Sequence, residues 1–298
     1  MPRLVTLAAA VLVVLVTVLL VVQLYQGSAL SRQKLGWGFL TSQKWDPVGE
    51  NFGAAPFLYG TVVTSFLSIV IAVPVGLGAA IFLAELAPPK ISDALTFVVE
   101  LLAAVPSVIY GLLAVFVLIS PLRDTVQPAL AKYLGFLPFF QGPSYGVGFL
   151  AAGLILAIMI LPFIVSISRE ALLAVPPEQR EAALAVGATR WEATWKVVVP
   201  YARLGIIGSV FLALARALGE TMAVTMVIGN TPKISASLFS PGYSIAAVIA
   251  NEFTEATSDM HVSALVELGL VLFALTIVIN GAARLLLEAT TRKGSAQG

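Results

Sequence analysis

Long uninterrupted apolar stretches are the feature that most constrains how this chain can fold. Six of them reach the roughly 20 residues that a helix needs to cross a bilayer, at residues 4–24, 58–86, 94–119, 147–167, 201–228 and 262–287. A soluble domain has about 25% charged residues, whereas this chain has 11% charged and 59% hydrophobic residues. The sequence therefore predicts an all-α membrane protein with six transmembrane helices.

Basic residues are unequally distributed between the two sides of the six stretches, and cytoplasmic loops normally carry the excess. With the N-terminus inside, ten lie in the cytoplasm and six outside, and Arg216 lies within the fifth stretch. We therefore expect both termini and loop 168–200 in the cytoplasm, and loops 25–57, 120–146 and 229–261 outside. The cytoplasmic residues are Arg3, Lys90, Arg169, Arg180, Arg190, Lys196, Arg203, Arg284, Arg292 and Lys293, and the outer ones are Arg32, Lys34, Lys44, Arg123, Lys132 and Lys233.

The composition excludes several classes of function. The chain has no cysteine, one histidine (His261) and a formal net charge of +1. Thiolate metal sites, iron–sulfur clusters and cysteine nucleophiles are therefore excluded, and no basic excess points to nucleic acid. The sequence also has no G-x-x-x-x-G-K-[ST] segment, so this chain has no P-loop for ATP. We expect no metal, no cofactor and no catalytic residue.

Loop 168–200 differs from the outer loops because it is charged and helical in pattern. Pro176 and Pro177 end one helix and start another, and Gly187 interrupts the second. Trp191 and Trp195 lie four residues apart, hence on one face of a further helix. A helix pair with exposed aromatic residues predicts a docking surface for another protein. The alternative is an interfacial helix that lies on lipid headgroups.

The spacing within this loop resembles the EAA loop of bacterial ABC-importer permeases. Glu181-Ala182-Ala183 is followed after three residues by Gly187, and after nine more by Val197-x-Val199-Pro200. The resemblance implies coupling helices seated in a cleft of a separate ATPase subunit, which would supply the missing P-loop. We expect Gly187 to occupy a tight turn in which only a small residue fits. The ATPase-coupling residues that the resemblance implies are Glu181, Ala182, Ala183, Gly187, Arg190 and Trp191.

Two charged residues lie inside the fifth stretch. A charge at mid-bilayer costs at least about 2.5–3.5 kcal/mol on insertion scales, so Arg216 and Glu220 require an explanation. Four residues separate them, so a continuous helix would pair them on one face, beside the small residues Gly205, Ser209, Ala213 and Ala223. One reading is a self-neutralised pair that locks helix packing. The other is an anion site on a translocation path, because the planar guanidinium fork matches phosphate-like oxyanions.

Three further acidic residues lie near membrane boundaries. Glu85 sits at the end of the second stretch close to Lys90, which favours a structural role. Glu100 and Glu267 lie a few residues inside their stretches, where they border the interface or pair with neighbouring helices. We assign neither of them a function.

The residues around Arg216 sharpen the resemblance. The fifth span of the PstC family of phosphate-importer permeases resembles the run Arg216-Ala-Leu-Gly-Glu-Thr-Met-Ala-Val-Thr-Met-Val-Ile-Gly-Asn230. Residues 82–85 and 105–111 resemble other segments of the same family. Glu100 departs from that pattern. The resemblance implies a type I ABC-importer permease (MetI-like) fold with cytoplasmic coupling helices, in a bacterial cytoplasmic membrane. It also implies a substrate path for inorganic phosphate through Arg216, Glu220, Ser209 and Thr221.

The same resemblance implies partners and a division of the chain. The partners are a PstA-like second permease, two PstB-like ATPases and an extracytoplasmic PstS-like phosphate-binding protein, within the lipid bilayer. Residues 1–57 form the first helix and an outer loop, residues 58–287 the permease core, and residues 288–298 a cytoplasmic tail. Three alternatives remain at this point: a permease for another oxyanion or solute, such as molybdate or sulfate; a secondary transporter or channel that uses Arg216 and Glu220 without ATP; and a membrane scaffold or sensor. Secondary transporters commonly have repeats and broken spans, and the sequence indicates neither.

Overall fold

The computed structural model describes residues 2–295, with side chains described for residues 3–282 and 285, and these residues are almost entirely helical. The elements that build the framework are α1 (Pro2–Gly27), α2 (Ala29–Leu35), α3 (Gly38–Thr41), α4 (Ala55–Ile81) with the π-helical turn η1 (Phe82–Leu86), α5 (Pro89–Ala104), α6 (Ser107–Leu113), η2 (Ala114–Leu118), α7 (Ile119–Pro121), η3 (Leu122–Val126), α8 (Gln127–Leu134), η4 (Pro138–Phe140), α9 (Phe149–Leu173), α10 (Pro177–Ala185), α11 (Arg190–Ala193), η5 (Thr194–Val198), α12 (Val199–Leu218), α13 (Met222–Thr225), α14 (Ile245–Glu252) and α15 (Asp259–Ser295).

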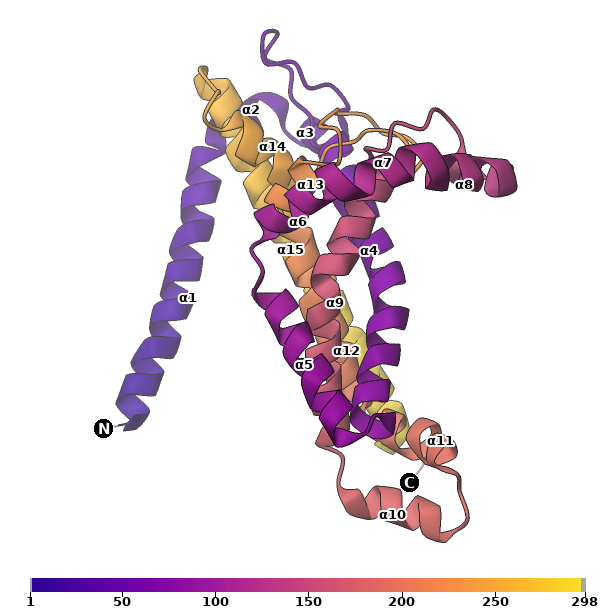
Figure 1. Cartoon of the computed structure of the whole chain (residues 1–298). Helices are drawn as coiled ribbons and strands as arrows, with labels where there is room; N and C mark the ends of the chain where they lie inside the picture. Colours follow the sequence, from indigo (N-terminus) through magenta and orange to yellow (C-terminus); the bar gives the residue numbers. More distant parts are fainter. Residues whose placement is uncertain (1, 296–298) are drawn as a thin grey trace.

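Six helical segments among the described residues are long and apolar enough to cross a bilayer. Four of them agree with the predicted stretches, and the third and fifth differ from them in ways that matter for the site. Figure 1 shows a bundle with α6–α8 across one end and α10 and α11 at the other, here named the α8 end and the α10 end. The six segments are Arg3–Gly27, Ala55–Leu86, Ser107–Leu134, Phe149–Leu173, Arg190–Leu218 and Asp259–Ala282.

Pro106 divides the third predicted stretch, residues 94–119. α5 ends two residues before this proline and α6 begins directly after it, because proline lacks an N–H and disfavours helix at the preceding residue. Pro106 has no N–H to donate to the Leu102 carbonyl four residues earlier. The Tyr110 hydroxyl donates a 2.7 Å hydrogen bond to that carbonyl instead. Figure 1 shows α5 along the bundle and α6–α8 turned across its end. The prediction of one continuous span over residues 94–119 is therefore wrong.

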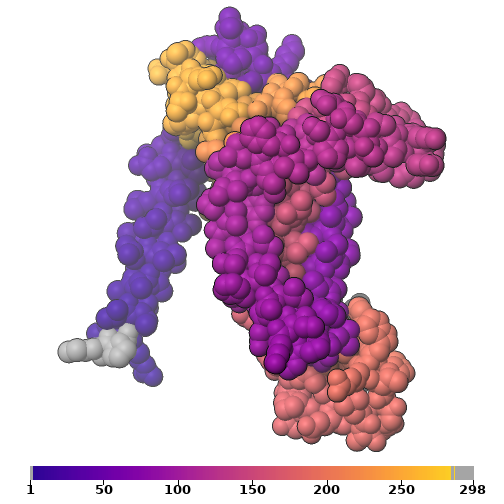
Figure 2. Space-filling view, in the orientation of Figure 1, coloured from indigo at the N-terminus to yellow at the C-terminus, as the bar shows by residue number. Residues whose placement is uncertain are grey.

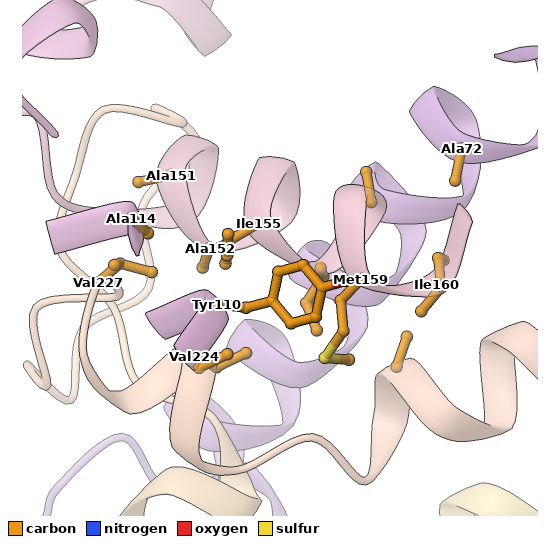
Figure 3. Close-up of a cluster of buried hydrophobic side chains, with 14 of the residues drawn as sticks. Ala72, Tyr110, Ala114, Ala151, Ala152, Ile155, Met159, Ile160, Val224 and Val227 are labelled. Atoms are coloured by element: carbon orange, nitrogen blue, oxygen red, sulfur yellow. The ribbon is translucent and has the colours of Figure 1, made fainter. Parts of the chain in front are cut away.

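The centre of the bundle consists of α4, α9 and α12 packed closely together. Small residues allow this approach: a Cβ added at Gly153 would lie 2.5 Å from the Leu67 side chain, and one added at Gly76 would lie 2.8 Å from Ile164. Such contacts replace the hydrophobic effect as the force that joins helices in lipid. Figure 3 shows Tyr110 and Met159 at the middle of the largest buried cluster, where α6 and α13 meet α9.

α1 makes little contact with the rest of the chain. None of its most apolar window is buried, and Figure 2 shows it as a separate column beside the bundle. Its far end is fixed to α15, because the Ser263 hydroxyl donates to the Gly27 carbonyl at 2.9 Å and accepts the Ser31 N–H at 3.1 Å. A helix that is apolar on all sides requires lipid or another protein around it.

The last helix is longer than predicted. α15 continues to Ser295, eight residues beyond the predicted end of the sixth span at residue 287. Most of the predicted tail, residues 288–298, therefore continues this helix, and residues 296–298 lie outside the described part of the chain.

Candidate coupling surface and anion site

The predicted coupling loop forms a helix pair that projects from the α10 end of the bundle (Figure 2). α10 has no buried residue along its length, so Glu181, Ala182 and Ala183 all lie on a helix that this chain leaves uncovered. Val186, directly after the helix, is 86% exposed. The helix pair that the sequence predicted is confirmed, and its exposed position leaves it free to contact another protein.

Gly187 ends α10 through its backbone conformation. Its φ is +90°, a region that L side chains rarely adopt. The Gly187 N–H donates to the Leu184 carbonyl at 3.0 Å and the Ala188 N–H to the Ala183 carbonyl at 3.1 Å, which is the Schellman arrangement. A Cβ at Gly187 would have no neighbour within 4 Å. The steric reason given for this glycine is therefore wrong, and the constraint is its positive φ.

α11 begins with a capping box. The Thr189 hydroxyl accepts the Glu192 N–H, and the Glu192 carboxylate accepts the Thr189 N–H, which satisfies two free donors of the helix start. Trp191 and Trp195 lie edge to face with their ring centroids 5.6 Å apart, so the predicted shared face is confirmed. Both rings are exposed, Trp191 by 56%, and they add an aromatic patch to the surface formed by α10.

Arg180 connects α10 to the membrane helices, a role that the sequence did not reveal. Its Nη2 lies 2.8 Å from Glu85 Oε1 and donates to the Leu172 carbonyl at 2.7 Å, while its Nη1 donates to the Val175 carbonyl. Glu85 therefore pairs with Arg180 and not with Lys90, because η1 and the start of α10 meet although 95 residues separate them. The neighbouring cavity of about 300 Å³ is lined in part by Arg190.

The fifth predicted stretch, residues 201–228, is also broken. α12 ends at Leu218, and the chain passes through Gly219 and Glu220 before α13 begins. Because the helix stops between them, Arg216 and Glu220 form no ion pair. The Glu220 carboxylate instead accepts the Ala223 N–H at 3.3 Å. The continuous helix and the resting pair predicted from four-residue spacing are therefore wrong.

Arg216 lies at the last turn of α12 with its side chain exposed. Its guanidinium carbon sits 4.4 Å from the centre of the Phe163 ring, a cation–π contact that leaves the edge of the fork available for hydrogen bonds. Thr221 follows the break and is half-buried. The arrangement places a permanent cation, a carboxylate and a hydroxyl within six residues, at a break in a membrane helix.

Ser209 lies in a helix contact two turns before Arg216. It is fully buried, its hydroxyl lies 2.8 Å from the Ser168 hydroxyl on α9, and it donates to the Ile206 carbonyl. A Cβ on nearby Gly205 would lie 2.4 Å from the Ala171 Cβ. The small residues of α12 therefore bring α9 close instead of leaving room beside Arg216, and the structure does not bring Ser209 to the guanidinium.

The breaks in the third and fifth stretches lie against each other. A Cβ added at Gly111 on α6 would lie 3.2 Å from the Ala223 Cα on α13 and 2.4 Å from the sulfur of Met226, which follows α13. Figure 3 shows Tyr110 from α6 beside Val224 from α13. Broken helices inside a membrane expose backbone groups where substrates bind. The apolar pattern predicted no broken span, although Pro106 and Gly219 were the available signals.

Comparison with known proteins identifies relatives of the whole chain. Residues 72–292 match the family model of the binding-protein-dependent transport system inner membrane component. The phosphate transport system permease protein PstC of Mesorhizobium japonicum is 50% identical over 286 residues, covering 95% of this chain and 88% of that protein. PstC of Pasteurella multocida is 45% identical over 288 residues, covering 95% of this chain and 90% of its own.

Solved structures of importers share the fold. A chain of a bacterial alginate ABC transporter superposes with a TM-score of 0.60 at 17% identity, covering 93% of this chain and 92% of that one. A chain of the MetNI methionine ABC transporter, inward facing, gives a TM-score of 0.58 at 19% identity, covering 78% of this chain and 94% of its own. The fold is that of ABC-importer permeases, as predicted. The chain is thus a multi-pass membrane protein that belongs to the family of binding-protein-dependent transport system inner membrane components, among the PstC permeases.

Proposed function

We propose that this chain is a permease subunit of an ATP-driven phosphate importer. The observation that carries the proposal is Arg216, an exposed arginine at the break of a membrane helix, in a chain 50% identical to a phosphate permease. An arginine inside a membrane span is costly and marks ion pathways in transporters. The uncovered face of α12 supplies one wall of the path, and a second permease supplies the other.

Phosphate matches the groups around the break. It carries a charge of roughly −1.5 at neutral pH, and the guanidinium offsets part of the cost of removing it from water. Protonated phosphate has an O–H donor that the Glu220 carboxylate accepts, whereas sulfate at this pH has none. Thr221, at the start of α13 after the break, offers a hydroxyl group. Ser209 lies two turns before Arg216 and supports this site by holding α12 against α9, through its contact with Ser168.

Transport is driven by ATPases that dock on α10 and α11. The exposed EAA segment, Gly187, Arg190 and Trp191 form the docking surface, and this chain has no P-loop of its own. Arg180 links the surface to η1 and to the end of α9. Movement of α10 therefore reaches two of the three helices at the centre of the bundle. The complex contains a PstA-like permease, two PstB-like ATPases and a PstS-like binding protein at the α8 end.

Orientation follows from the ATPases, which are cytoplasmic. The α10 end and both termini lie in the cytoplasm, and the α8 end lies outside the bacterial cytoplasmic membrane. The ten-to-six excess of basic residues on the α10 side supports the same orientation.

The substrate is tested by ATP hydrolysis in the reconstituted complex. Binding proteins loaded with phosphate, sulfate or molybdate are added in turn at equal concentration. Phosphate-loaded protein is expected to stimulate hydrolysis at least about tenfold more than the others, since a mismatched buried polar group costs about 1.4 kcal/mol or more. Equal stimulation by sulfate or molybdate would assign the permease to another oxyanion.

A further inference from the structure

A pocket unrelated to the proposed phosphate path lies where α1 and α2 meet α15. Its volume is about 510 Å³, and most of its lining is apolar. The junction of α1 and α2 with α15 is at the α8 end of α1 (Figure 1), and the Ser263 contact that fixes α1 to α15 is there too. Trp37 and Tyr25 line the pocket, and these residue types concentrate at the level of lipid headgroups.

The pocket contains a buried carboxyl group without a full set of partners. Glu267 on α15 lines the pocket and is only 6% exposed. Its Oε2 makes no well-aligned hydrogen bond to any described residue, and the Ser31 hydroxyl lies within reach of the carboxyl group. A buried polar group in this state costs free energy unless a ligand satisfies it. The carboxyl group lines the pocket and can accept hydrogen bonds from a cationic donor there.

A positive charge lines the same pocket. Arg32 lies 3.7 Å over the Tyr25 ring and uses Nε and Nη2 to donate to Ser28 and to the Tyr25 carbonyl. Its Nη1 makes no hydrogen bond within the part of the chain that the structure describes, and Arg32 and Glu267 form no ion pair there. The two side chains therefore offer an acceptor and a donor that a single ligand with both charges can bridge.

We propose that this pocket binds a phospholipid with a primary-amine headgroup, of the phosphatidylethanolamine class. The ammonium group donates to the Glu267 carboxyl group, and the phosphate accepts from Arg32. The apolar lining of Leu270, Val271 and Ala274 contacts the start of an acyl chain. The pocket lies at the level where α1 leaves the bundle, so the lipid fills the wedge between α1 and α15.

Headgroup chemistry separates this lipid from its common alternatives. A quaternary choline has no N–H donor for the Glu267 carboxyl group. A glycerol headgroup has no positive charge, so its lipid brings net negative charge to a buried carboxyl group. A primary ammonium offers three donors, and hydrogen bonds to charged groups are roughly twice as strong as neutral ones. The pocket therefore selects the primary amine.

The test is native mass spectrometry of the delipidated complex in detergent. An equimolar mixture of dioleoyl phosphatidylethanolamine, phosphatidylcholine and phosphatidylglycerol is added, and the retained lipids are counted for each variant. The wild type is expected to retain phosphatidylethanolamine about tenfold over phosphatidylcholine, which corresponds to one charged hydrogen bond. Glu267→Gln is expected to bring this preference to within about twofold, because the charge is lost while the shape is kept.

Two further variants keep the outcome interpretable. Glu100→Gln removes an exposed carboxylate on α5 and should leave the preference unchanged. Val271→Trp fills the pocket without changing its polar groups and should reduce retention of this lipid if the pocket is its site. An unchanged preference in both Glu267→Gln and Val271→Trp would overturn the proposal. So would a photo-cross-linker at position 274 that captures the second permease instead of lipid.

Discussion

A guanidinium at position 216 keeps its positive charge in any part of a membrane, because arginine cannot be deprotonated in proteins. The Phe163 ring beneath it fixes the plane of the fork without neutralising it. Since the carboxylate of Glu220 lies beyond the end of α12 and accepts a backbone N–H, the cation has no acidic partner within the described residues. In the proposed function, an arriving anion is the group that completes its coordination.

Substitutions at Arg216 separate its charge from its shape. Arg216→Lys keeps the charge and loses the planar fork, so phosphate uptake should fall about tenfold while the complex assembles normally. Arg216→Gln removes the charge and should reduce uptake about a hundredfold. Uptake of radiolabelled phosphate into proteoliposomes measures both. Arg203→Gln, an exposed arginine on the same helix, is the matched control and should keep at least half of the wild-type rate.

The double variant Arg216→Gln with Glu220→Gln distinguishes anion binding from internal neutralisation. If the two residues only balanced each other's charge, removing both would restore uptake. The absence of an ion pair in the structure predicts instead that the double variant stays as inactive as Arg216→Gln. A folded double variant with normal phosphate uptake would contradict the role of Arg216.

At the scale of elements, the end of α10 depends on the positive φ of Gly187. Gly187→Asp and Gly187→Val should both disturb the Schellman turn, and the β-branched valine should do so more strongly because such residues tolerate positive φ least. Gly187→Asn should be the mildest change, since asparagine is enriched at positive φ. The measurement is co-purification of the ATPase together with phosphate-stimulated hydrolysis. Normal coupling in Gly187→Val would show that the turn is not required.

The Arg180–Glu85 contact holds α10 against the membrane helices. Glu85→Ala leaves the guanidinium without its carboxylate and should cost about 1.5–3 kcal/mol of local stability. Limited proteolysis near residue 186 should therefore become faster, while thermal unfolding of the whole complex changes little. Glu178→Ala on the exposed first turn of α10 is the control. Equal protease sensitivity in the two variants would show that the Arg180–Glu85 contact does not hold α10 in place.

The sequence predicted elements best where a local pattern determines them. The apolar stretches located four spans, and the Trp191–Trp195 spacing gave a contact that the structure contains. The prediction of continuous spans was wrong where a single residue ends a helix inside a long apolar stretch. Pro106 and Gly219 do so, although the sequence stays apolar on both sides of each. The Arg180–Glu85 contact joins residues 95 positions apart, and no local spacing encodes such a contact.

At the scale of the whole molecule, orientation can be tested cleanly because the chain has no cysteine. Val48 lies in the loop that we expect outside and Val186 lies directly after α10, and both positions are almost fully exposed, so each can carry a single cysteine (Val48→Cys, Val186→Cys). An impermeant thiol reagent added to intact spheroplasts should label Val48→Cys alone. Lysis of the spheroplasts should make Val186→Cys reactive, which controls for its accessibility. Labelling of Val186→Cys from outside would reverse the orientation.

The isolated chain leaves large apolar surfaces uncovered, as the uncovered α1 column shows (Figure 2). Membrane helices of this kind are completed by lipid or by neighbouring subunits. The exposed Arg216 face and the exposed α10 surface fit an assembly in which a second permease closes the path and the ATPases cover the α10 end. The proposed anion contact and the proposed ATPase-docking surface therefore lie at opposite ends of α12.

Vectorial transport by the complete complex is the sharpest test of ATP-driven phosphate import through Arg216. Proteoliposomes with the α10 end inside are loaded with ATP, and phosphate-loaded binding protein is added outside. We predict that radiolabelled phosphate accumulates in the lumen above its external concentration, and that Arg216→Gln abolishes this accumulation while the complex remains intact. Equal accumulation without ATP or without the binding protein would contradict an ATP-driven, binding-protein-dependent importer. Equal accumulation in the Arg216→Gln complex would contradict the role of Arg216 in anion binding.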